Sequence, residues 1–469
     1  MARSPKLRAM PALRKTEPPP SPAPSGGNEA SGATPTTKEA LAPGRDRFIP
    51  VSRYGLRAKL VARLKEGGGD ERVWGRALDC LAAWRHQDYR KRLLDLLEDY
   101  LPFSPDSDTV SLIELDDEGK AKARAEFIEG VERLLIHANY VRLSQEDLKR
   151  ILVERSPHGL SLQVDLSDFD DLLLYYRGTA IDMHEERNPW RLYLTKDRAE
   201  VPVFQRLFLL LKLKPTEARA AEIMAVTGAD QPRALKIARK RRSHLPISVS
   251  SGVIYVKVFK RIPQVDLEML FPNTKIAFRP FDKLKLLVTA GGGTAAGVMG
   301  TATKLLAATN PFTLAIGLAG LSAVIFRQVT KVFHTRNRYM MELAQNLYFC
   351  SLANNHGALT LIADNAEEED VKEDMLLYAF LVEMKGRREA LSSVKEAIGR
   401  FLAERCQVAV SFDVEDALRR LVADGLVQEA PGGILRALPP ETAREHLDKL
   451  WDRLLDIDAL DQAASPAKA

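Results

Sequence analysis

The sequence predicts a multidomain, mostly helical protein with an α+β middle domain, a transmembrane helical hairpin and a C-terminal winged-helix-like unit. First, 469 residues are too many for one ordinary hydrophobic core. Second, the apolar pattern changes from helical to strand-like near residue 158 and returns to helical after residue 334. Third, two long uncharged runs lie between these regions. The expected segments are a tail at 1–44, a helical domain at 45–155, the α+β domain at 156–282, the hairpin at 284–333, a helical region at 334–455 that contains the winged-helix-like unit at 391–437, and a second tail at 456–469.

The N-terminal tail is predicted to be disordered, because residues 1–44 hold nine of the 26 prolines. Five basic residues precede the first acid, Glu17, so a mitochondrial presequence is an alternative. Pro5 and Pro11 would interrupt the amphipathic helix of such a presequence, which favours a plain basic tail.

The helical domain is expected to begin at about Arg47 and to run to residue 155, with one break at the three glycines of 67–69. In the following α+β domain, short runs rich in Leu, Val, Ile and Tyr alternate with turn residues. These runs lie at 160–166, 172–176, 192–194, 247–259 and 275–278, with a helical stretch at 217–242. They predict a small, mainly antiparallel sheet.

The candidate membrane hairpin consists of residues 286–303 and 305–326, which carry no charge and are separated only by Lys304. As helices they would be about 27 and 33 Å long, against a hydrocarbon core of roughly 30 Å. Small residues would let the two helices approach closely. The residues that would form the hairpin contact or cap its second helix are Gly291, Gly293, Gly297, Pro311, Ala315 and Ala319. A buried helical pair in water and a single span by the second run are the alternatives.

Basic residues on both flanks of the hairpin place both ends on the same side of the membrane. Lys283 and Lys285 precede the first run, and Arg327 and Lys331 follow the second. This symmetry is typical of a hairpin with its domains on the positive-inside face.

The C-terminal region is predicted to contain a helix at 340–354 and another that starts at Asn365. The acidic run at 367–370 would then occupy the first turn of that helix, where the helix dipole favours negative charge. Residues 391–437 show the order helix, helix, hairpin, with Gly425 ending the second helix. That second helix balances its arginines with acids, so the unit is not expected to bind DNA.

The basic residues between Asp230 and Asp266 are candidate contacts for anionic lipid, since this stretch has nine Lys or Arg and no acid. The chosen candidates are Arg239, Lys240, Arg241, Arg242, Lys260 and Arg261. A solvated helix end is the simpler interpretation. Nucleic acid is a third, weakened by the lack of interleaved aromatic residues for base stacking.

No catalytic, metal or cofactor site is predicted. The eight histidines show no metal-ligand spacing, and three cysteines are too few for a disulfide framework. The glycines at 291–293 lack the acid that a dinucleotide site requires about 20 residues later. An enzyme acting on a lipid or another membrane-bound substrate remains the alternative. Its site would lie in the α+β domain, in a cleft holding Arg177, Asp182, His184 or Glu185.

The chain resembles a family called domain of unknown function 3754, which includes the animal mitochondrial transmembrane protein 143. The resemblance spans about residues 47–427 and lies in four motifs: Arg47-Phe48-Ile49-Pro50-Val51-Ser52-Arg53, Tyr175-Tyr176-Arg177-Gly178, Val256-Lys257-Val258-Phe259-Lys260-Arg261-Ile262-Pro263, and Leu352-Ala353-Asn354-Asn355-His356-Gly357. It implies membrane association and supplies no catalytic residues.

Together these observations predict a membrane-anchored, non-enzymatic scaffold that binds membrane lipids and contacts another protein through its C-terminal region. The Ala-, Arg- and Pro-rich tails favour a bacterial cytoplasmic membrane with the domains in the cytoplasm. In a eukaryote the expected location would be a mitochondrial membrane.

Overall fold

A computed structural model gives the arrangement of the chain between Phe48 and Leu454. The described residues exclude the following positions: 107–114, 145, 149–150, 152–159, 188–195, 244, 246–248, 273–274, 279–329, 331–340, 342–346, 385–390, 411–413 and 432–433. The predicted hairpin residues Gly291, Gly293, Gly297, Pro311, Ala315 and Ala319 therefore lie outside the described residues, as does the predicted strand at 192–194.

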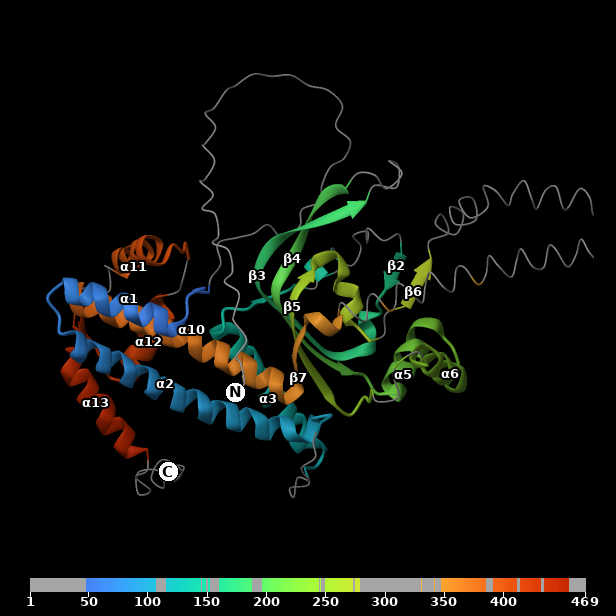
Figure 1. The fold of residues 1–469 in the computed structure, drawn as a ribbon. Helices are drawn as coiled ribbons and strands as arrows, with labels where there is room; N and C mark the ends of the chain where they lie inside the picture. The colour runs from blue at the N-terminus through green and yellow to red at the C-terminus, as the bar shows by residue number, and fades with distance from the viewer. Residues whose placement is uncertain are drawn as a thin grey trace, which may run out of the picture. The chain divides into compact units, whose positions relative to one another are not determined.

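The described elements are mainly helices, most of which come before or after a block of strands, while α5 and α6 lie between β4 and β5 (Figure 1). The helices are α1 (Arg53–Glu66), α2 (Glu71–Tyr100), η1 (Leu101–Phe103), α3 (Asp117–His137), η2 (Leu166–Asp168), α5 (Thr216–Thr227), α6 (Gln231–Arg242), η4 (Gln264–Leu270), α10 (Asn355–Met384), α11 (Leu391–Cys406), α12 (Val414–Ala423) and α13 (Pro440–Arg453). The strands are β1 (Val141–Arg142), β2 (Leu160–Gln163), β3 (Phe169–Arg187), β4 (Lys196–Leu213), β5 (Ile254–Pro263), β6 (Lys275–Phe278), β7 (Ser351–Asn354), β8 (Val427–Ala430) and β9 (Ile434–Ala437).

The central sheet has five strands in the order β1-β3-β4-β5-β7, and every described neighbouring pair is antiparallel. Its middle is the long β3–β4 hairpin, which extends past the other strands (Figure 1). Side chains alternate between the two faces, as the strand period of two requires. Leu173 and Phe208 pack toward the long helices, whereas Leu174 and Leu207 pack toward η4.

The long helix α10 connects the sheet to the rest of the helices. It lies beside α2 and also contacts α1, α3, α11 and α12 (Figure 1). Its first half, up to Ala366, belongs to an apolar core shared with α2, α3 and the sheet. Its second half, from Val371, belongs to another apolar core shared with α1, α2 and the C-terminal helices.

The predicted mostly helical fold with a central antiparallel sheet is confirmed. The helix–helix–hairpin order at 391–437 is present as α11, α12 and the β8–β9 pair. Gly425 follows α12 with a φ of 73°, and this left-handed conformation explains why a glycine ends the helix there. Within the part of the chain that the structure describes, no helix combines the length and apolar character needed to span a membrane.

Two expectations near the start of α10 are wrong. Residues 351–354 form strand β7, although a helix was expected up to residue 354. The next helix begins at Asn355 and not at Asn365. Asn355 has a φ of 45°, and its Oδ1 accepts a hydrogen bond from the Val256 N–H at 3.0 Å. This side chain stabilises the corner between strand and helix by pairing with the neighbouring β5, a contact that local patterns do not reveal.

Candidate functional site

The most unusual feature of the core is a charged stretch in the middle of α10. Its residues are at most 5% exposed: Glu369, Asp370, Lys372, Glu373 and Asp374. They lie where the two apolar cores meet. The sequence predicted that the acidic run at 367–370 occupies the first turn of a helix. This prediction is wrong, because the run begins twelve residues after Asn355, the first residue of α10. The helix dipole acts only within the first turn.

At the N-terminal end of this stretch, Glu369 forms hydrogen bonds that fix the segment leading into α1. Its carboxylate accepts hydrogen bonds from the Ile49 N–H at 2.9 Å, from Arg177 at 2.8 Å and from Lys372 at 2.7 Å. The Lys372 ammonium also donates to the Ile49 carbonyl at 2.7 Å. The Arg177 guanidinium stacks over the Phe48 ring at 4.4 Å. One carboxylate thus ties the N-terminal segment, β3 and α10 together.

At the other end, Arg420 of α12 contacts three carboxylates of α10. Its guanidinium lies 2.9 Å from Asp370, 3.0 Å from Glu373 and 2.8 Å from Asp374. Arg85 of α2 lies 2.9 Å from Asp374 and 2.6 Å from Asp424, which follows α12. The two arginines therefore join α2, α10 and α12.

Neutral donors and a histidine complete this cluster. Tyr89 donates to Asp370 at 2.6 Å, Asn139 donates to Glu373 at 3.2 Å, and His137 Nδ1 lies 3.1 Å from Asp370. Burial opposes ionisation of Asp370, but the hydrogen bond with His137 and the charge of Arg420 hold its pKa below the ordinary value. Burial instead raises the pKa of Glu373 to about 8. Two carboxyl groups that share Arg420 thus have pKa values shifted in opposite directions.

We call the residues Glu369, Asp370, Lys372, Glu373 and Asp374, with Arg85, Arg177 and Arg420, the α10 ion network. Each of its carboxylates has a donor within the protein. Such a saturated arrangement suits holding elements in place rather than binding a ligand, since no described carboxylate in it lacks a partner.

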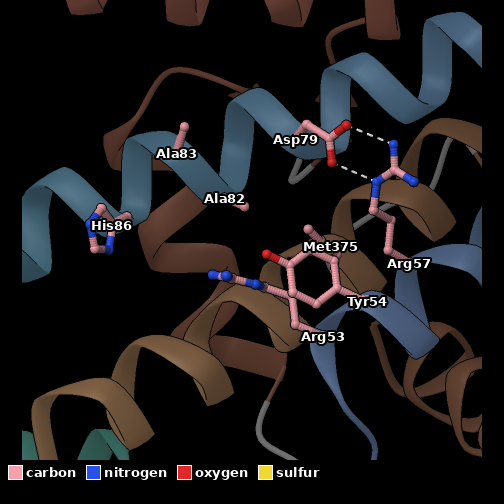
Figure 2. Close-up of a pocket in the computed structure, with 8 residues that line it drawn as sticks. All are labelled: Arg53, Tyr54, Arg57, Asp79, Ala82, Ala83, His86 and Met375. Atoms are coloured by element: carbon pink, nitrogen blue, oxygen red, sulfur yellow. Dashed lines mark hydrogen bonds and ion pairs between the residues drawn. The ribbon is translucent and has the colours of Figure 1, made fainter. Parts of the chain in front are cut away.

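A pocket of about 320 Å³ lies between α1, α2 and α10 (Figure 2). Its lining is Arg53, Tyr54, Arg57, Asp79, Ala82, Ala83, His86 and Met375. Arg57 and Asp79 face each other through two contacts, as Figure 2 shows. Arg53 and His86 both reach Glu367, at 3.0 and 2.8 Å. Arg53, Arg57 and His86 of this pocket thus have acidic partners, and no nucleophile with an adjacent base is present among its lining residues.

A larger cavity of about 560 Å³ lies between α2 and α3 and reaches His137. None of the residues proposed for a lipid-directed enzyme lines either pocket. Arg177 belongs to the α10 ion network, Asp182 pairs with Arg261, and the side chains of His184 and Glu185 lie outside the described ones. Within the described ranges, no group of three or more His, Cys, Asp or Glu could hold a metal ion.

The candidate lipid contacts at the end of α6 have two different roles. Arg241 pairs with Asp165 at 2.9 Å, and Arg242 donates to the Lys214 carbonyl and to Thr216. Both side chains therefore join α6 to its surroundings. Arg239 and Lys240 are exposed, together with Arg233 and Lys236.

Lys260 and Arg261 are exposed but do not extend the α6 surface. In the sheet, Ile254 pairs with Lys212 near the start of α5, whereas Lys260 pairs with Arg206. Six residues of strand separate these positions, which is about 20 Å. The six candidate contacts are thus divided between two places on the surface.

Residues 169–357 match the model of a family described as protein of unknown function (DUF3754). This match begins with β3 and ends in the first turn of α10, so it contains β3, β4, β5 and β7 of the central sheet, α5, α6 and the region of the predicted hairpin. It confirms the resemblance to that family over these residues. No solved structure matches the chain.

Proposed function

We propose that this protein is a non-enzymatic scaffold that is anchored in a membrane by the segment 284–333. One face of α6 binds anionic lipid headgroups of the same membrane. The observation that carries the proposal is the α6 basic face, which consists of Arg233, Lys236, Arg239 and Lys240. At 3.6 residues per turn these four side chains fall within about 120° of the helix circumference. The buried Ala234 and Ala238 fix the opposite face against the protein.

The charge of this face is uncompensated within the described part of the chain. No ion pair joins any of the four residues to a described acid, and α6 itself contains no Asp or Glu. Each Lys or Arg near an anionic bilayer contributes about 1 kcal/mol of attraction. Four such residues on one face would therefore favour an anionic membrane over an uncharged one.

The position of α6 supports the same proposal. Asp165, two residues after β2, contacts Arg219 of α5 and Arg241 of α6 at 2.8 and 2.9 Å. Strand β2 pairs with β6, whose last residue is Phe278 (Figure 1). The last described residue before the predicted hairpin therefore belongs to a two-stranded ribbon whose other strand is followed by a contact with α6.

The scaffold role is supported by the α10 ion network, which joins α2, α10, α12 and the segment before α1, and in which each carboxylate has a donor within the protein. The C-terminal elements are the proposed contact for another protein. Arg420, one of the two arginines on α12, has a side chain that is only 10% exposed and pairs with α10, so it is not available to a phosphate backbone. The proposed location is a bacterial cytoplasmic membrane, or a mitochondrial membrane in a eukaryote, with both termini on the same side.

Fractionation tests the anchor, and lipid preference tests the α6 basic face. We expect the full-length chain to resist carbonate extraction and, after transfer from an uncharged detergent, to float preferentially with vesicles containing phosphatidylserine. Replacing Arg233, Lys236, Arg239 and Lys240 with Gln should remove this preference and its salt dependence. The matched control removes four exposed cations of α2 (Arg72, Arg76, Arg90 and Lys91) and should retain both. Recovery of the full chain in the aqueous fraction would refute the anchor, and an equal loss in both variants would refute the α6 contact.

A further inference from the structure

Two adjacent aromatic side chains are exposed where the chain returns to the sheet. Residues 347–350 are helical, and Leu347 and Cys350 pack against the core on the η4 side of the sheet. Tyr348 and Phe349 between them are 77% and 70% exposed. Their rings meet edge to face at 5.3 Å. The short helix thus turns its apolar anchors inward and presents a pair of aromatic rings outward.

Basic residues lie next to this pair. Phe259 of β5 pairs with Ser351 of β7, and the two strands are antiparallel. The next residue of β5, Lys260, therefore lies on the side of residues 349 and 350. Burial raises the pKa of the Cys350 thiol, and the nearby Lys260 ammonium opposes that rise. Lys260 and Arg261 are both exposed, and Arg261 pairs with Asp182. Lys260 is therefore the cation that lies beside the aromatic rings on the surface.

We infer that Tyr348, Phe349 and Lys260 form an interfacial anchor that enters the headgroup region of the bilayer. The inference rests on the proposed membrane association. Tyrosine and other aromatic side chains favour the boundary between headgroups and acyl chains, where a neighbouring lysine meets lipid phosphate. Tyr348 lies fifteen residues after the end of the predicted hairpin at residue 333, so the aromatic pair is close in sequence to the proposed anchor.

A second copy of the chain fits this surface less well than a bilayer does. A stable protein interface buries about 800 Å² on each partner, and two rings with one lysine provide only part of that area. In a symmetric contact the cations of both copies would also be brought together, which is unfavourable. A bilayer with anionic lipid instead complements both the rings and the charge.

The test places an environment-sensitive fluorescent amino acid at position 348 of the full chain. The control position is Tyr54 on α1, which is 73% exposed and lies far along the sequence from β7. Both proteins are mixed with vesicles of phosphatidylcholine and phosphatidylserine, with or without lipids brominated near the headgroup. We expect the brominated lipids to quench the fluorophore at 348 and to leave the one at 54 unchanged.

The outcomes separate this inference from the proposed function. If both proteins bind vesicles and neither fluorophore is quenched, the interfacial anchor is refuted and membrane association stands. If neither protein binds vesicles, the proposed function is refuted and the anchor with it. A blue shift at 348 without quenching would show that another part of the chain covers the rings, which also overturns the inference.

A pair of substitutions gives a second measurement. Changing Tyr348 and Phe349 together to Ser should weaken binding to these vesicles about tenfold, whereas Tyr54→Ser should leave it unchanged. All three residues are exposed, so thermal unfolding should be similar in every variant and would reveal any loss of folding. Equal vesicle affinity of the double variant and the wild type would contradict the anchor.

Discussion

The α10 ion network and the α6 basic face are both dense in charge, but they differ in where the opposite charges lie. In the network, Arg420 alone contacts three carboxylates, and every carboxylate has a partner contributed by another part of the chain or by α10 itself. On α6, the four exposed cations have no described acidic partner. Paired buried charges hold helices together, whereas unpaired exposed charges remain available for an external anion. The number of charges in a segment therefore does not determine its role.

Among the tests of this difference, Arg420→Met is expected to cause the largest loss of stability. The variant leaves three buried carboxylates without their shared cation, and breaking one partner of a buried ion cluster costs about 3–5 kcal/mol. Arg419→Met is the matched control, because its side chain is 75% exposed and pairs only with Asp416 among the described acids. Urea unfolding should show a much lower midpoint for the first variant and a change within about 0.5 kcal/mol for the second. Similar midpoints would mean that the network contributes no more than a surface pair.

An intermediate effect, dependent on pH, is expected from Glu373→Gln. The native pKa of Glu373 is about 8, above its ordinary value of 4.5. Between these values the folded protein keeps a proton that the unfolded chain has released, so this group lowers stability as pH rises through that window. The slope is at most about 1.4 kcal/mol per pH unit. The variant lacks this term and should gain stability relative to the wild type as pH rises from about 5 to about 8.

Urea unfolding at several pH values measures this gain. Glu404→Gln, at an exposed position of α11, is the control and should differ from the wild type by a constant amount. A difference between Glu373→Gln and the wild type that does not change with pH would show that Glu373 is ionised in the folded protein.

The smallest expected change in stability distinguishes Arg241 from Arg239, two residues of α6. Arg241→Gln removes the contact with the partly exposed Asp165 and should lower stability by about 0.2–1 kcal/mol, whereas Arg239→Gln should leave stability unchanged. Lipid preference should show the reverse order, with the larger loss in Arg239→Gln. If both variants behave alike in both measurements, the division of the basic stretch into an internal and an external part is wrong.

Local signals in the sequence predicted several turns and helix ends. The Ser144 Oγ accepts the Asp147 N–H at 3.0 Å, a capping contact between residues three positions apart. Gly425 ends α12 as expected, and the strands on either side of the residues 431–433 pair with each other. Caps, left-handed glycines and hairpin turns depend on residues a few positions apart, so a single sequence contains the information needed to place them. The family resemblance in the sheet region was likewise visible in contiguous motifs.

Only the tertiary structure decided what the charged segments do. The partners of the α10 acids lie far away in sequence: Tyr89 is 281 residues from Asp370, and Ile49 is 320 residues from Glu369. The same applies to α6, where Asp165 binds Arg241 and leaves Arg239 exposed. The sequence showed where charge is concentrated, because that is a local property. Whether a charge is buried and paired depends on which distant segments pack around it, because burial removes water and makes an internal partner necessary.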